Sequence, residues 1–195
     1  TKLDACKYRF GLTGTLDGTQ THRLVLEGLF GKAKYVVTTK ELIDNKTLSN
    51  LKINCIVLKY PDEDRQIVKE FDYGAELEYI VTKVERNLFL CDLMGHCNGS
   101  TLCLFQFVEK HGEPLYDIIS NKYKDRKVFF VYGGVSTDTR EEIREIVENE
   151  TDAIIVASYG TFSTGINIRN IDNIVFASPS KSKIRVLQSL GRGLR

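Results

Sequence analysis

The chain of 195 residues is 42% hydrophobic and 27% charged, a composition that indicates a folded globular protein of one domain or slightly more and excludes a disordered chain. Its formal net charge of +1 excludes a strongly basic field over the whole molecule, so any phosphate binding must come from local patches. No apolar run reaches the length of a membrane span, and no charged-then-apolar leader opens the sequence. We therefore expect a cytoplasmic protein without membrane contact.

The first sixty residues contain short apolar runs separated by polar loops. Residues 8–15 predict the end of a strand followed by a loop of small residues, and residues 21–30 predict a helix. Residues 35–38 and 53–60 are β-branched runs that predict two further strands.

A regular pattern follows in the second half of the chain. From residue 74 to residue 96 apolar side chains recur near helical spacing and predict one long helix. The predicted strands beyond it are 101–107, 127–132, 153–157 and 173–177, and the predicted helices are 114–121, 137–149 and 182–190. Strands that alternate with helices predict an α/β fold, with a parallel sheet covered by helices on both faces.

The polar stretch 44–50 separates these two parts and predicts a boundary between residues 1–49 and residues 50–195. The sequence starts on Thr1 rather than methionine and stops on Arg195 inside a predicted helix. We therefore expect it to be a fragment.

The five cysteines are an odd number, sit mostly in apolar runs and include no Cys-x-x-Cys pair: Cys6, Cys55, Cys91, Cys97 and Cys103. We interpret them as reduced, buried thiols of a cytosolic protein. Three of them could be grouped with His96 as metal ligands, but the spacing matches no standard zinc site. Core packing is the favoured interpretation.

The terminal helix carries the strongest chemical signal. Gln188, Gly191, Arg192 and Arg195 follow the spacing i, i+3, i+4 and i+7, which places them on one helical face. Residues 181–195 include five basic residues and no acidic one. Guanidinium groups bind phosphate oxygens in a bidentate way and can stabilise charge on a transferring phosphoryl group. The alternative is a helix whose basic end only complements its own dipole.

Upstream segments decide between these alternatives. The terminal helix resembles motif VI (Gln-x-x-Gly-Arg-x-x-Arg) of superfamily-two helicases. Residues 158–168 resemble motif V, residues 101–107 motif IV, Tyr132-Gly133-Gly134 the intervening glycine turn, and Thr13-Gly14-Thr15 motif III. Each alone occurs by chance, but five in the right order, each at a predicted strand or helix end, form a specific pattern. Within the superfamily, the sequence is similar to DNA helicases of T-even phages.

The resemblance implies two RecA-like lobes with ATP and Mg²⁺ in the cleft between them. Residues 1–49 would then be the tail of the first lobe, and residues 50–195 the second lobe. It also implies that Arg192 and Arg195 reach the ATP phosphates, that Gln188 helps to close the cleft, and that Thr13, Gly14 and Thr15 couple the ATP state to lobe movement. The residues implied beside the nucleotide are Gly165, Asn167 and Gly191. Many relatives have aspartate in place of Asn167, whose amide can donate and accept hydrogen bonds but supplies no charge.

The same resemblance implies a nucleic-acid groove across both lobes. The residues that match its motifs are Ser158, Thr164 and Gly165 in motif V, Phe105 and Gln106 in motif IV, and Gly133 and Gly134 in the glycine turn. Glycine permits close backbone approach, and hydroxyls and amides bind phosphate without reading a base, which suits a motor that grips any sequence. The expected partners are branched or single-stranded DNA and RNA–DNA hybrids, in recombination, replication and repair.

The sequence lacks the parts that would let it hydrolyse ATP alone. No Gly-x-x-x-x-Gly-Lys-Ser/Thr loop is present, since the look-alikes at residues 28–32 and 95–101 have the wrong spacing or no lysine. The acidic residues 62–64 are interpreted as the solvated start of a helix rather than as magnesium ligands. We expect the phosphate loop and the magnesium ligands in a first lobe upstream. Two alternatives stay open, namely a duplex translocase of a restriction or remodelling enzyme and a non-catalytic nucleic-acid-binding module of RecA-like shape.

Overall fold

A parallel β-sheet forms the centre of the molecule. The structure is a computed structural model that describes residues 6–193 apart from residues 14–15, 17 and 165–167, and it describes no side chains for residues 162–164 and 192–193. The four strands, all parallel, are β1 (Thr101–Phe105), β2 (Val128–Val131), β3 (Ile154–Ser158) and β4 (Asn173–Phe176), in the order β2-β3-β1-β4. All four lie where the sequence predicts strands, and the α/β prediction is confirmed.

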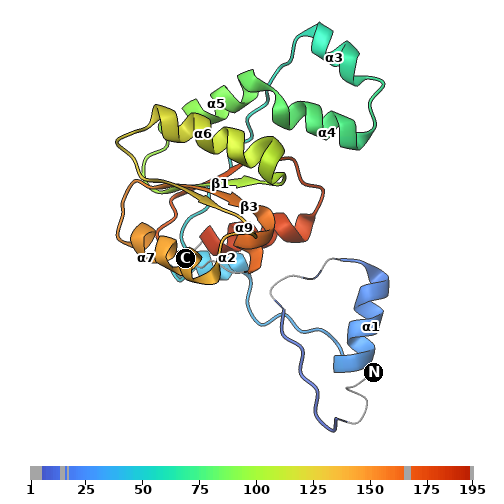
Figure 1. Cartoon of the computed structure of the whole chain (residues 1–195). Helices are drawn as coiled ribbons and strands as arrows, with labels where there is room; N and C mark the ends of the chain where they lie inside the picture. Colours follow the sequence, from blue (N-terminus) through green and yellow to red (C-terminus); the bar gives the residue numbers. More distant parts are fainter. Residues whose placement is uncertain (1–5, 14–15, 17, 165–167, 194–195) are drawn as a thin grey trace.

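Helices cover both faces of this sheet, because successive strand residues point to opposite sides. On one face, Leu102 and Leu104 pack in a core with Val147 of α7 (Thr137–Glu148). On the other face, Cys103 and Phe105 pack in a second core that includes side chains of α5 (Val84–Gly95) and α6 (Glu113–Lys122). Figure 1 shows α5 and α6 on one side of the strands and α7 with α9 on the other.

The remaining helices lie mostly outside these two cores. They are α1 (Gln20–Phe30), α2 (Thr39–Asp44), α3 (Asp62–Val68), α4 (Tyr73–Thr82), a π-helix η1 (Val108–Gly112), α8 (Tyr159–Thr164) and α9 (Lys183–Gly193). The acidic residues 62–64 form the first turn of α3, as the sequence predicts. In Figure 1, α1 lies apart from the sheet, and none of the described residues before Leu77 is buried.

The predicted strands of the first sixty residues are wrong. Residues 35–38 and 53–60 contain no strand; Thr38 instead begins α2 with a capping box, in which its hydroxyl accepts from the amide of Glu41. The described residues of 8–15 also contain no strand. A β-branched run favours extended backbone, but a strand is stable only when it is paired in a sheet. Valine and isoleucine in these runs are accordingly exposed, for example Val36 at 96% and Val57 at 81%.

The single long helix predicted for residues 74–96 is also wrong, because the chain is extended at Lys83 (ψ 119°) between α4 and α5. The buried Asn87 donates its side-chain amide to the carbonyl of Val81 (3.0 Å) and so satisfies an acceptor that the break releases. Lys83 forms an ion pair with Asp64 of α3 (2.6 Å), and the Tyr79 hydroxyl donates to the same carboxylate (2.7 Å). Contacts with α3 therefore accompany a break that the apolar spacing alone does not predict.

The interpretation of the cysteines is partly wrong. Cys91 and Cys103 are buried in the core as expected, whereas Cys6 and Cys55 are exposed and Cys97 is half-buried. Burial raises the pKa of the Cys103 thiol to about 12, so it is a packing group rather than a nucleophile. The two exposed thiols lie in the segment that is not packed on the sheet.

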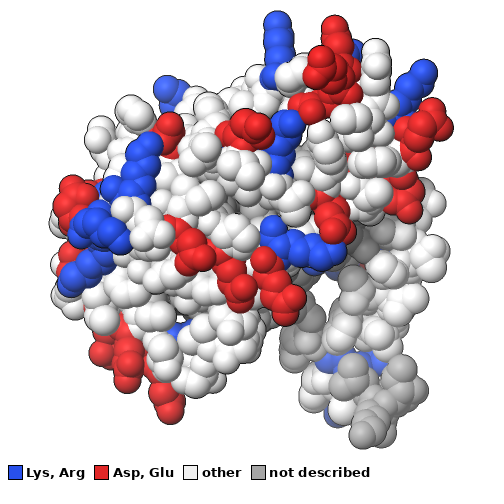
Figure 2. All heavy atoms as spheres, turned by 45° about the horizontal axis from the view of Figure 1, so that its top comes forward, with Lys and Arg blue, Asp and Glu red and all other residues white. Residues whose placement is uncertain are grey.

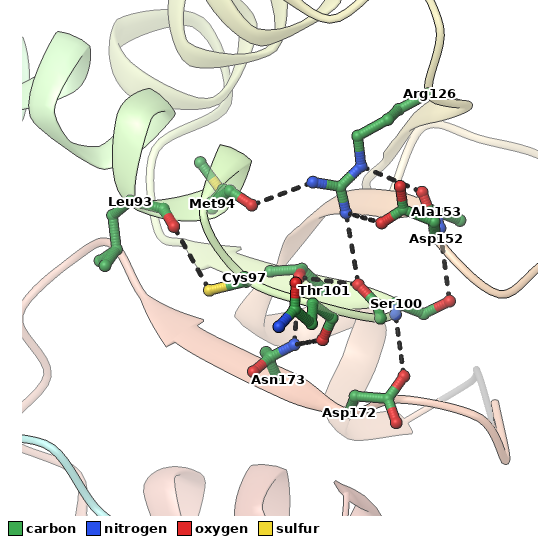
Figure 3. A network of polar contacts seen from close by, with 12 residues as sticks. Leu93, Met94, Cys97, Ser100, Thr101, Arg126, Asp152, Ala153, Asp172 and Asn173 are labelled. Atoms are coloured by element: carbon green, nitrogen blue, oxygen red, sulfur yellow. Dashed lines mark hydrogen bonds and ion pairs between the residues drawn. The ribbon is translucent and has the colours of Figure 1, made fainter.

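A polar network fastens the amino-terminal edge of the sheet (Figure 3). The Arg126 guanidinium, whose side chain is 7% exposed, pairs with the carboxylate of Asp152 (2.5 Å) and donates to the carbonyls of Met94, Gly99 and Asp152. The amide of Ser100 donates to Asp172 (2.8 Å), next to β4. One guanidinium thus holds the end of α5 and the segments before β1 and β3.

We expect Arg126→Met to lower the free energy of unfolding by about 2 to 3 kcal/mol, because it removes a largely buried cation together with donors to three carbonyls. Urea unfolding measures this. The matched control is Lys127→Met, which breaks the more exposed ion pair with Glu150 and should change stability much less. Equal losses in the two variants would contradict the role given to Arg126.

Candidate nucleic-acid and nucleotide site

Three of the motif segments follow strands that end at the same edge of the sheet. Phe105 is paired in register with Ser158, and Val131 with Ala157, so β1, β2 and β3 end level with one another. Gln106, the turn at residues 132–134 and Ser158 therefore lie along one edge. Sequence order alone separates these positions by up to about fifty residues, and the parallel pairing brings them together.

The boundary between β1 and β3 has the topology of a ligand-binding crevice. The chain leaves β1 toward the face covered by α5 and α6, because Leu115 of α6 lies in that core. It leaves β3 toward the opposite face, where Tyr159 of α8 packs with Val147. Open α/β sheets bind ligands outside the carboxyl ends of strands at such a point of divergence. The motif IV and motif V segments flank it here.

Ser158 occupies the turn between β3 and α8. Its hydroxyl lies 2.8 Å from that of Thr161 and accepts from the Thr161 amide (3.3 Å), an interaction typical of a helix N-cap. The backbone of Thr164 ends α8, and its side chain lies outside the described atoms. Gly165 and Asn167 lie outside the described residues.

The motif IV segment requires a correction at Phe105. Its ring is fully buried and stacks on Phe130 (centroids 5.5 Å apart), so the side chain belongs to the core and offers no surface to nucleic acid. Gly112 of η1 packs directly over this ring, because a side-chain carbon there would lie 2.6 Å from it. The Gln106 side chain is exposed, whereas the backbone amide of Gln106 donates to the Ser178 hydroxyl (3.0 Å). Its side chain is thus the part of motif IV that faces solvent.

The glycine turn follows β2 directly. The amide of Val135 donates to the carbonyl of Tyr132 (3.0 Å), which closes a turn around Gly133 and Gly134. A side-chain carbon at Gly133 would meet no atom within 4 Å, whereas one at Gly134 would collide with the Tyr132 ring. The surface beside Gly133 is therefore open to a close-lying group.

Helix α9 carries the described residues of motif VI. Gln188 and Gly191 are exposed, while Ser189 is fully buried and donates to the carbonyl of Arg185 (2.9 Å). The backbone of Arg192 lies in α9, but its side chain is outside the described atoms, and Arg195 is outside the described residues.

The motif III position is not brought to this edge in the described structure. Thr13 is exposed and belongs to the N-terminal segment that Figure 1 shows apart from the sheet. Gly14 and Thr15 lie outside the described residues.

A buried polar network behind the edge was missed by sequence reasoning. His111 is fully buried, and its Nδ1 lies 2.9 Å from the hydroxyl of Ser178. The Tyr159 hydroxyl donates to the Ser178 carbonyl (2.6 Å), and Arg86 of α5 donates to the adjacent carbonyl of Ala177. No local pattern marks these residues, since each lies in a different segment and only the fold brings them together.

The pKa of His111 is lowered to about 4, first by burial and second by the Arg86 cation, so the imidazole is neutral near pH 7. Burial likewise raises the pKa of Tyr159. The network is thus a set of neutral groups around one guanidinium, which suits a structural role rather than proton transfer.

Acidic and basic residues are mixed over the side of the molecule that α5 and α6 cover. Figure 2 turns the side covered by α5 and α6 toward the reader, and acidic and basic side chains are interspersed across it. Several of them form pairs there, for example Lys110 with Glu78 (2.7 Å) and Lys122 with Asp92. No single-sign field marks that visible face as a phosphate-binding surface.

The chain is basic around the start of α9. Lys181 lies two residues before this helix, Lys183 and Arg185 lie in its first turn, and no acidic residue lies between them. Within the described ranges, no group of three or more His, Cys, Asp or Glu side chains could hold a metal.

No helix in the described part of the chain is long and apolar enough to span a bilayer.

Comparison with known proteins assigns the family. The profile of the helicase conserved C-terminal domain matches residues 85–195, more than half of the chain. The chain belongs to this helicase family. The matched region begins in α5 and includes the whole sheet, so the helicase domain coincides with the packed part of the structure.

Two curated proteins resemble the chain over most of its length. The ATP-dependent DNA helicase uvsW of Enterobacteria phage T4 is 38% identical over 99% of this chain and 38% of its own length. The putative ATP-dependent helicase IRC3 of Saccharomyces cerevisiae is 27% identical over 80% of this chain and 23% of its own length. The chain thus spans well under half of each of these relatives.

The crystal structure of T4 UvsW superposes with a TM-score of 0.64 at 38% identity, covering 85% of this chain and 32% of that one. The predicted resemblance to superfamily-two helicases of T-even phages is therefore confirmed at the level of sequence and fold. The role of each site residue stays a prediction.

The buried imidazole predicts a pH dependence of stability. The folded-state pKa of His111 is about 4 and its ordinary value is 6.5, so the unfolded chain binds the proton first as the pH falls. Stability from this group is complete above pH 6.5 and should fall toward pH 4, by at most about 1.4 kcal/mol per pH unit, the slope for one proton.

Urea unfolding between pH 7 and pH 4 measures the effect. His111→Asn, which keeps a nitrogen or oxygen near the Nδ1 position but does not titrate, should flatten the slope over this window. The control is His96→Asn at an exposed position, which should retain it. An unchanged slope in His111→Asn would show that another group causes the dependence.

Proposed function

We propose that the chain is the second RecA-like lobe of an ATP-dependent DNA helicase, together with the tail of the first lobe, and that the helicase remodels branched DNA or RNA–DNA hybrids. In this proposal residues 1–49 belong to the first lobe and residues 50–195 to the second. The observation that carries it is the meeting of the motif IV, glycine-turn and motif V segments at one carboxyl edge of a parallel sheet. The family match and the 38% identity to the phage DNA helicase support it.

The nucleic-acid strand would lie along this edge. The exposed Gln106 side chain, the open surface at Gly133 and the hydroxyl-bearing turn at Ser158 offer neutral donors and close approach rather than base-specific contacts. Such groups bind a phosphate backbone without reading sequence. Thr164 and Gly165 follow at the end of α8 and complete the proposed contact.

The nucleotide would lie against α9. Gln188, Arg192 and Arg195 would face the ATP phosphates, with Gly191, Gly165 and Asn167 nearby. ATP supplies the phosphoryl group, and this chain would contribute cations that stabilise its developing charge. Magnesium ligands and the phosphate loop would come from the first lobe, where Thr13, Gly14 and Thr15 would couple the two lobes.

The exposed apolar side chains of the N-terminal segment support this division. Several are almost completely exposed, including Phe10 at 85%, Leu12 at 99% and Tyr35 at 85%. Exposed apolar surface of this extent is typical of a segment that packs against another part of a protein. The remainder of a first lobe is the partner that the proposal assigns to it.

Removing one proposed phosphate contact tests the motor. In the full-length protein, Arg195→Ala should lower DNA-stimulated ATP turnover by about three orders of magnitude, because a positioned guanidinium stabilises the transferring phosphoryl group. Steady-state phosphate release measures this. Arg169→Ala, at an exposed arginine outside motif VI, is the control and should leave turnover unchanged. Unchanged turnover in Arg195→Ala would refute the motor and favour a non-catalytic binding module.

A second substitution tests the proposed groove. Thr164→Ala should weaken DNA binding several-fold while leaving the KM for ATP largely unchanged, because it removes one hydroxyl contact to phosphate. Fluorescence anisotropy with single-stranded and forked DNA measures the first quantity. Thr151→Ala, an exposed threonine before the amino end of β3, is the matched control. Equal DNA affinity in the two variants would remove Thr164 from the groove.

The type of movement requires a direct assay. A helicase separates the strands of a forked duplex, whereas a duplex translocase displaces a third strand from a triplex without separating the duplex. Fork unwinding that needs ATP would support the proposal. Triplex displacement without unwinding would favour the translocase.

A further inference from the structure

Ser178 lies two residues beyond β4 and contacts β1, η1, α8 and the residue that follows β1. The residue is 1% exposed. Its hydroxyl accepts from the amide of Gln106 (3.0 Å) and lies 2.9 Å from Nδ1 of His111 in η1. The Ser178 carbonyl accepts from the Tyr159 hydroxyl at the start of α8 (2.6 Å). The Ser178 backbone amide donates to the carbonyl of Leu104 in β1 (3.3 Å).

These contacts join two of the motif segments to the stretch of chain that leads to a third. Gln106 belongs to motif IV and Tyr159 to motif V, while Ser178 itself lies five residues before α9, which carries motif VI. Further contacts hold the short connection to α9. The Lys181 ammonium lies 3.5 Å from the ring centroid of Tyr73 in α4, and the Arg185 guanidinium lies 5.5 Å from that of Tyr159.

Two of the polar groups in this network share the single hydroxyl of Ser178. Nε2 of His111 is already buried without a hydrogen-bond partner among the described residues. Gln106 N–H and His111 Nδ1 both use the same hydroxyl, so loss of that one oxygen would leave two polar groups unsatisfied. A buried network of this kind favours a single arrangement of the backbone segments that it joins.

We infer that Ser178 is a positioning residue that holds the proposed strand-contacting segments, at Gln106 and α8, in a fixed relation to the proposed ATP-facing helix α9. A displacement of Gln106 or α8 by a bound strand is then transmitted to α9 through one buried side chain and its carbonyl. The inference rests on the proposed function, and its consequence is coupling between nucleic-acid binding and ATP turnover.

The test compares two buried serines at opposite edges of the sheet. Ser100 is also fully buried, and its hydroxyl accepts from the amide of Ala153 (3.4 Å) at the amino edge, away from the site. Ser178→Ala and Ser100→Ala therefore remove the same atom from equally buried positions. The measured quantity is the ratio of DNA-stimulated to basal ATP turnover in the full-length protein. Partial unfolding lowers both rates by the same factor and leaves this ratio unchanged.

We expect Ser178→Ala to lower the ratio by about tenfold and to raise the DNA concentration for half-maximal stimulation, because the loss of a buried hydrogen-bonding oxygen corresponds to a change of that order. Ser100→Ala should leave both quantities at the wild-type values. A second variant, Tyr159→Phe, keeps the buried ring and removes only the hydroxyl that donates to the Ser178 carbonyl. Tyr159→Phe should lower the ratio several-fold, and this variant tests the inference if Ser178→Ala does not fold.

The outcomes separate the inference from the proposed function. Wild-type protein without DNA-stimulated turnover would refute the proposed function, and the inference with it. Wild-type stimulation combined with equal ratios for the Ser178, Tyr159 and Ser100 variants would overturn the inference alone. A selective loss at Ser178 and Tyr159 would support both.

Discussion

The parallel register of β1, β2 and β3 is the constraint on which the candidate site depends. Because the strands run in the same direction and end level, the segments that follow them are placed side by side although they are far apart in sequence. The divergence of the chain after β1 and β3 onto opposite faces is the topology at which open α/β sheets bind ligands. The geometry therefore brings three of the motif segments to one edge of the sheet.

The two ends of this sheet are fastened by different chemistry. At the amino edge a largely buried guanidinium, Arg126, binds three backbone carbonyls and one carboxylate (Figure 3). At the carboxyl edge neutral groups share one serine beside the Arg86 guanidinium, and one imidazole nitrogen has no hydrogen-bond partner among the described residues. The first arrangement anchors the strands, whereas the second joins segments that a motor would need to move together.

Local signals in the sequence predicted secondary structure correctly where the neighbours of a residue along the chain supply its environment. The four strands and the helices α6, α7 and α9 were predicted because each carries its own apolar periodicity and turn residues, whereas η1 and α8 were not predicted. The acidic first turn of α3 was predicted for the same reason. Local signals failed at residues 35–38 and 53–60, where β-branched side chains have no adjacent strand among the described residues. They also failed at Lys83, where contacts with α3 accompany a break in a continuous helical pattern.

The sequence by itself determined the α/β class, the order of the motif segments and the helical face that Gln188 and Gly191 share, because periodicity and spacing are local properties. Only the tertiary structure decided that Phe105 is a core residue and that Gln106 is the exposed part of its motif, since burial depends on which helix covers the strand. It alone brought His111, Tyr159 and Ser178 together. Their contacts join segments up to 72 residues apart, a separation over which no pattern in a single sequence carries information about proximity.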